Sequence, residues 1–69
     1  MRERLQQLVE EMIDKGIRYE DARREFDKQF ISRVIATSDG NLGQAAKRLG
    51  VHRNTLTRRL RDLKLRVPR

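Results

Sequence analysis

Cysteine and tryptophan are both absent from the 69-residue chain, and histidine occurs once. No disulfide can form, and zinc sites built from thiolates or from several histidines are excluded. No apolar run approaches the roughly 18 residues that suggest a membrane-spanning helix. The N-terminal segment mixes both charge signs, which is not the pattern of a signal peptide. Because so short a chain without disulfide or metal is near the limit of independent stability, we expect a second copy to complete its core.

Positive charge is abundant, and it is unevenly distributed. The formal net charge is +7, with a pI of about 11.1. Residues 47–69 contain nine Lys or Arg and one acid, a net charge of +8, whereas residues 1–46 carry −1. Such an excess indicates an acidic partner, with nucleic acid or an anionic membrane surface as the leading candidates.

Helical periodicity dominates the N-terminal half. Residues 2–15 predict one helix with a single apolar stripe, ended by Gly16 in a left-handed C-cap. Residues 20–38 predict a second helix, ended near Gly40. Its apolar residues recur every four positions (Ala22, Phe26, Phe30, Val34), and Ile31 and Ile35 add a second apolar face. Two apolar faces are more than one neighbouring helix can cover.

The C-terminal half predicts two shorter helices. Asn41 and Gln44 form a capping-box pattern at the start of a helix over Leu42–Leu49, which Gly50 ends. A fourth helix runs from about Arg53 to Leu63. The expected fold class is all-α: a single domain of four helices over residues 1–69. It comprises an N-terminal helix pair (1–39), a helix-turn-helix (40–65) and a basic tail (66–69).

The helix-turn-helix interpretation depends on the spacing of small and apolar residues. Ala45, Ala46 and Leu49 should face inward, Gly50 should allow the sharp turn, and Val51 should fill the corner. The fourth helix would bury Leu56, Leu60 and Leu63. The alternative is a plain αα-hairpin on a basic bundle.

The outer face of the fourth helix holds the candidate contacts. In a helix-turn-helix, the first residues of the second helix meet base edges, and later basic residues contact phosphates. The base-contact candidates are Arg53, Asn54, Thr57 and Arg58, and the phosphate candidates are Lys47, Thr55, Arg59 and Arg61. For each arginine the alternative is a solvated surface role. His52 is open between a DNA contact and a helix cap.

Residues 40–65, GNLGQAAKRLGVHRNTLTRRLRDLKL, resemble the Fis-type helix-turn-helix. That motif occurs in the nucleoid protein Fis and in the C-terminal domain of NtrC-type activators, and the segment RNTLTR looks especially like the NtrC type. The likeness is weaker over residues 20–39, and over 1–19 it rests only on the presence of a helix.

The resemblance implies an intertwined homodimer formed by the first two helices, and a bent DNA site. The implied dimerisation residues are Leu5, Leu8, Val9, Met12, Ile13, Phe26, Phe30, Ile31, Val34 and Ile35. The alternative is the core of a monomeric bundle. The implied DNA contacts are His52, Arg53, Asn54, Thr55, Thr57 and Arg58; Asn54 and Thr57 depart from Fis itself, so base preference should differ.

The sequence therefore predicts a cytoplasmic, nucleoid-associated bacterial protein that binds double-stranded DNA as a homodimer, either as a transcriptional regulator or as a DNA-bending protein. The alternative is a basic module that binds protein or RNA. No carboxylate pair, activated nucleophile or phosphate-cradling loop is visible, so we expect no enzymatic activity, no cofactor or metal, no membrane contact and no small-molecule substrate. Whether the chain acts alone or within a larger regulator is left open.

Overall fold

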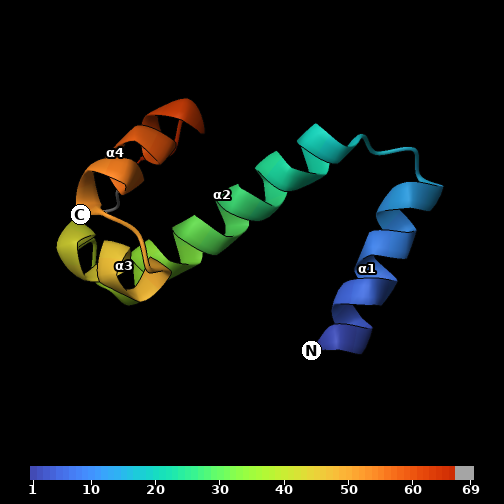
Figure 1. Cartoon of the computed structure of the whole chain (residues 1–69), viewed down its shortest axis with the longest axis horizontal. Helices are drawn as coiled ribbons and strands as arrows, with labels where there is room; N and C mark the ends of the chain where they lie inside the picture. The colour runs from blue at the N-terminus through green and yellow to red at the C-terminus, as the bar shows by residue number, and fades with distance from the viewer. Residues whose placement is uncertain (67–69) are drawn as a thin grey trace.

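The computed structural model describes residues 1–66 and contains four helices within them (Figure 1). The helices are α1 (Arg2–Asp14), α2 (Tyr19–Thr37), α3 (Leu42–Leu49) and α4 (Arg53–Asp62). The all-α prediction is confirmed, and the predicted helix ends are correct to within one residue. The predicted basic tail falls outside the described residues except for Arg66. No helix in the described part of the chain is long and apolar enough to cross a membrane.

The core lies where α3 and α4 pack together and against the second half of α2. Its buried residues are Ile31, Ile35, Ala45, Ala46, Leu56, Leu60 and Leu63, with Val34, Leu42, Leu49 and Leu65 packed around them. Ala45 and Ala46 are fully or almost fully buried, which explains why both positions hold the smallest apolar side chain. A longer side chain at either would push α3 away from its neighbours.

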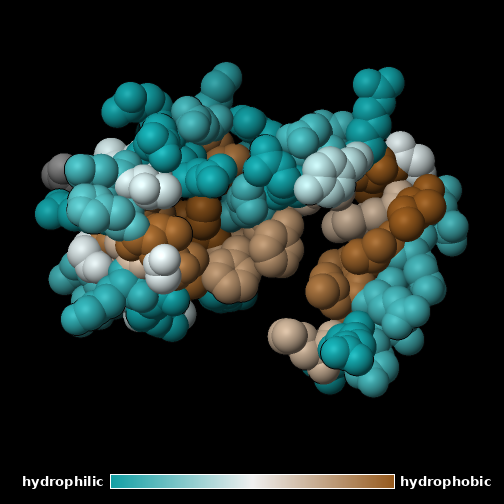
Figure 2. Space-filling model, viewed as in Figure 1, coloured by the Kyte–Doolittle hydropathy of each residue, from teal (hydrophilic) through white to brown (hydrophobic). Residues whose placement is uncertain are grey.

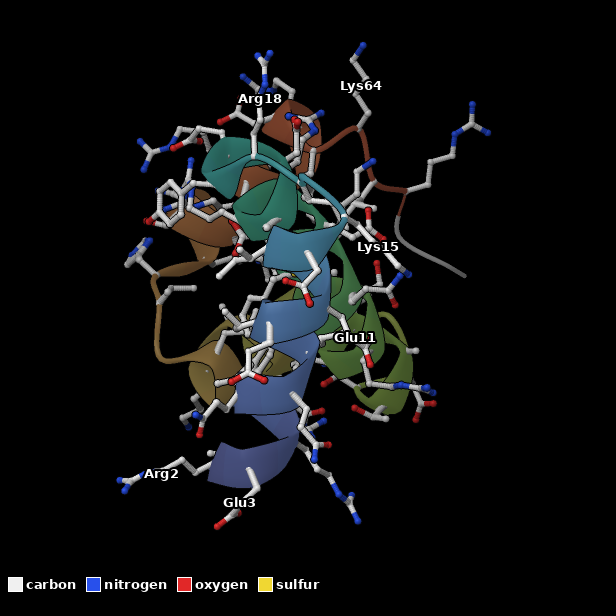
Figure 3. All side chains as sticks on the ribbon, turned by 90° about the vertical axis from the view of Figure 1, so that its right-hand side faces the viewer. Arg2, Glu3, Glu11, Lys15, Arg18 and Lys64 are labelled. Atoms are coloured by element: carbon white, nitrogen blue, oxygen red, sulfur yellow. The ribbon has the colours of Figure 1, made fainter. Side chains whose placement is uncertain are left out.

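Helix α1 stands apart from this core (Figure 1). None of its residues is buried, although it has a continuous apolar stripe. That stripe borders an open groove that it shares with Ile17, Ala22 and Phe26. Figure 2 shows the apolar side chains of α1 gathered on the side that faces the rest of the molecule. Figure 3 shows the opposite, polar side, from which Glu3 and Glu11 project.

The whole chain is more open than a compact monomer of its size. Its accessible surface is 6205 Å², whereas a folded 8.2 kDa monomer exposes about 4,500 Å². Its radius of gyration is 13.5 Å, against about 11 Å expected for a compact chain of this length. No residue of α1 or of the first half of α2 is buried.

Three details differ from the sequence-based expectations. The sequence predicted that α2 ends near Gly40, but its C-cap is Ser38. The first residue after this cap, Asp39, already has a left-handed backbone (φ 53°), and Gly40 follows it with a φ of 76°. Val51 was expected to fill the corner of the turn, but it is 41% exposed. Ile31 and Ile35 were grouped with the dimerisation residues, but they are buried inside the chain's own core, because that face of α2 packs against α3 and α4.

Candidate nucleic-acid interface

The turn between α3 and α4 is built by local hydrogen bonds. Helix α3 begins at the Asn41 cap, whose Oδ1 accepts a hydrogen bond from the Gln44 backbone N–H at 3.0 Å. It ends at Gly50, which has a φ of 74° that an L side chain rarely adopts. The Val51 backbone N–H then donates to the Ala46 carbonyl at 3.0 Å. The chain therefore reverses within a few residues and starts α4 directly against α3.

Packing through three leucines determines which side of α4 faces solvent. Leu56, Leu60 and Leu63 are all buried. Arg58 lies about 160–200° around the helix axis from Leu56 and Leu60, and Asn54 and Arg61 occupy the same outer side. All three are exposed. The structure therefore brings these side chains together on one outer face, with Arg53 and Thr57 along one edge of it.

His52 is the N-cap of α4. Its Nδ1 accepts a hydrogen bond from the Asn54 backbone N–H at 3.1 Å. The cap interpretation that the sequence left open is thus confirmed. The Nδ1 atom must carry a lone pair in this arrangement, so Nε2 is the ring atom that can bind a further partner. The side chain is exposed, so the predicted DNA contact stays compatible with the cap.

The two threonines differ in their surroundings. The Thr57 hydroxyl donates to the Arg53 carbonyl at 3.1 Å, which occupies its proton and leaves the methyl group and the oxygen lone pairs for a partner. Thr55 is half-buried beside the core. Both lie in the first turns of α4, where base and phosphate contacts are expected.

Arg59 and Lys47 lie apart from the outer face of α4. Arg59 borders a shallow apolar groove that it shares with Phe26 and Phe30 of α2, on the side of α4 that faces α2. Lys47 is exposed on α3 and borders a shallow pocket beside Ser38 and Gln44. If Arg59 and Lys47 contact phosphates as predicted, they do so from either side of the outer face of α4.

Sequence reasoning overlooked Arg48. Its Nη1 donates to the Thr37 hydroxyl at 2.7 Å and to the Ser38 hydroxyl at 3.2 Å. Ser38 is buried, so this arginine satisfies a hydroxyl oxygen that water reaches poorly. Arg48 thereby ties α3 to the end of α2. The only available signal was a cation in the last turn of α3, which by itself indicates a solvated residue.

The charged side chains of α4 are almost all positive. Asp62 is the only acid on α4, and it lies at the last position of the helix. No group of three or more His, Cys, Asp or Glu that could hold a metal ion occurs within residues 1–66. The outer face of α4 thus offers guanidinium, amide and hydroxyl groups to an anionic, hydrogen-bonding partner.

A short α3, a tight glycine turn and a cation-rich α4 with its first turns exposed define a helix-turn-helix domain. The sequence comparison gives the family: residues 22–63 match the family described as "Bacterial regulatory protein, Fis family". The chain belongs to this family.

One relative extends the match to more of the chain. The DNA-binding transcriptional regulator NtrC of Azospirillum brasilense is 39% identical over 51 residues, which are 74% of this chain. The chain spans only 11% of the length of that relative. No solved structure matches the chain significantly.

Proposed function

We propose that this chain binds double-stranded DNA through α4 and acts in bacterial transcriptional regulation. The observation that carries the proposal is the outer face of α4, where Asn54, Arg58 and Arg61 are exposed together opposite the buried leucines. Arginine can bridge guanine O6 and N7, and asparagine can bridge adenine N6 and N7. The NtrC relative, a DNA-binding regulator by name, supports the same class of partner.

The binding unit in this proposal is a homodimer. Its interface would use the apolar faces of α1 and α2 that the single chain leaves open, namely Leu5, Leu8, Val9, Met12, Ile13, Phe26, Phe30 and Val34. The surface in excess of a compact monomer is about 1,700 Å², more than the roughly 800 Å² that each partner buries in a standard interface. Ile31 and Ile35 would support this interface from beneath.

In the dimer, a two-fold axis would place two α4 helices in successive major grooves of a near-palindromic site. Because DNA bending is a property of Fis-like dimers, flexible base steps would contribute to site choice. A nucleoid-associated, cytoplasmic location follows from this function. The same role requires no catalytic group, cofactor or small-molecule substrate.

Fluorescence anisotropy with labelled duplex DNA tests the proposal. The logarithm of the binding constant should fall linearly with the logarithm of salt concentration, with a slope of about −0.9 for each phosphate neutralised. Unlabelled duplex DNA should compete far better than structured RNA at the same salt concentration. Binding that does not respond to salt, or equal competition by RNA, would contradict the proposal and favour a protein- or RNA-binding module.

A further inference from the structure

The last carbonyl groups of α4 accept hydrogen bonds of two kinds, from the backbone that follows the helix and from a side chain of α2. Locally, the Leu65 N–H donates to the Leu60 carbonyl at 2.9 Å and the Lys64 N–H donates to the Arg61 carbonyl at 3.1 Å, the pattern of a Schellman motif. Lys64 takes the left-handed position (φ 57°), and its side chain points away from the helices in Figure 3. The next carbonyl, that of Asp62, accepts a hydrogen bond from Arg24 Nη2 at 3.1 Å.

This hydrogen bond joins α2 to α4, and the two residues that form it are 38 positions apart in the chain. Arg24 lies in the first half of α2, beyond the part of that helix that packs in the core. A guanidinium at the C-terminus of a helix is also stabilised by the negative end of the helix dipole. Apolar packing of the leucines has no preferred direction. The solvent-exposed hydrogen bond between Arg24 and Asp62 has a preferred distance and angle.

We propose that Arg24 is a positioning residue that sets the angle between α2 and α4, and through it the spacing of the two α4 helices in the dimer. The second half of the proposal rests on the proposed function. Since α2 carries part of the proposed interface, any rotation of α4 about the core changes where its outer face points relative to the two-fold axis. Arg24 would therefore contribute to site discrimination without touching DNA.

Arg23 supplies a matched control. It is the preceding residue of α2, and its guanidinium pairs with Glu20 of the same helix at 3.0 Å. The hydrogen bond with Glu20 raises the pKa of Arg23. Arg23→Gln and Arg24→Gln each remove one positive charge from α2, so they weaken any long-range attraction to DNA alike. Arg23 also borders the open groove beside α1, so the variants are compared at a concentration where sedimentation shows parent and both variants in the same oligomeric state. Only Arg24→Gln removes the guanidinium that reaches α4.

The first measurement needs no DNA. Residual dipolar couplings of backbone amides report the angle between α2 and α4 in solution. We expect this angle to change, or its couplings to shrink through averaging, in Arg24→Gln but not in Arg23→Gln, with partial recovery in Arg24→Lys. Couplings in Arg24→Gln that equal those of the parent would overturn the inference, whatever the protein binds.

The second measurement is the ratio of affinities for a preferred duplex and a scrambled one, at equal fractions of folded protein. The ratio should fall about threefold to tenfold in Arg24→Gln, the size expected for the loss of one solvent-exposed hydrogen bond. It should be unchanged in Arg23→Gln. An equal ratio in both variants would overturn the role in discrimination. A parent protein that binds no duplex at all would overturn the proposed function, while the helix angle would still decide the positioning role.

Discussion

At the scale of single residues, Arg58 and Arg59 are neighbours in the sequence but lie on different sides of α4. Arg58 lies opposite the buried leucines, whereas Arg59 borders the groove beside Phe26 and Phe30 of α2. A helix that enters a major groove presents one face to the base edges. The two arginines should therefore contribute differently to DNA binding, although they carry the same charge.

The comparison of Arg58→Ala with Arg59→Ala tests this difference. Arg58→Ala should weaken binding to the preferred site by about 1–3 kcal/mol, the value of one good bidentate base contact, and should relax base preference at one position. Arg59→Ala should weaken binding to preferred and scrambled duplexes by the same small factor. Anisotropy titrations at one salt concentration give both numbers. Equal losses of discrimination in the two variants would show that the face of α4 is wrongly assigned.

Single residues also show how far sequence reasoning reaches. The Asn41 cap and the buried leucines of α4 were predictable, because both follow from local spacing. The left-handed position at Asp39 was missed, since glycine is the usual residue there and Gly40 is adjacent. The contact of Arg24 with the Asp62 carbonyl was not predictable, because it depends on how α4 packs across α2 and leaves no local pattern.

At the scale of elements, the four helices could be read from the sequence almost to the residue. What the periodicity could not decide was which apolar face of α2 packs within the chain. The Ile31 and Ile35 face does so, and Phe26 and Phe30 are about half exposed. Val51 was misjudged for a related reason: it lies beside the same exposed phenylalanines, at the edge of the core rather than in it.

The apolar stripe of α1 gives a prediction for that element. Leu8→Glu places a charge in the proposed interface, so it should shift the protein from dimer toward monomer in sedimentation velocity runs at micromolar concentration. Gln7→Glu adds the same charge about 100° around the helix from Leu8, on the exposed side of α1 that is opposite the centre of the apolar stripe, and should leave the dimer intact. No residue of α1 is buried in the single chain, so neither change should unfold the α3–α4 unit. A parent protein that sediments as a monomer would contradict the intertwined homodimer, and so would equal sedimentation of the two variants.

At the scale of the whole molecule, charge and apolar surface are separated along the chain. Residues 1–46, with a net charge of −1, carry the open apolar faces, and residues 47–69, with a net charge of +8, carry the end of α3, the turn and α4. This separation suits a protein that joins a second copy at one end and a polyanion at the other. The chain exposes more surface than a compact monomer of its mass, and the proposed dimer would bury that additional surface.

Selection of bound sequences from a random duplex library tests the central claim most directly, because it examines DNA binding, base preference and two-fold symmetry in one measurement. The account predicts enrichment of an inverted repeat whose two half-sites lie about one helical turn apart or somewhat closer, with flexible steps between them. Enrichment of a solitary half-site would contradict the dimer. No enrichment over the starting library would contradict the reading of DNA by α4.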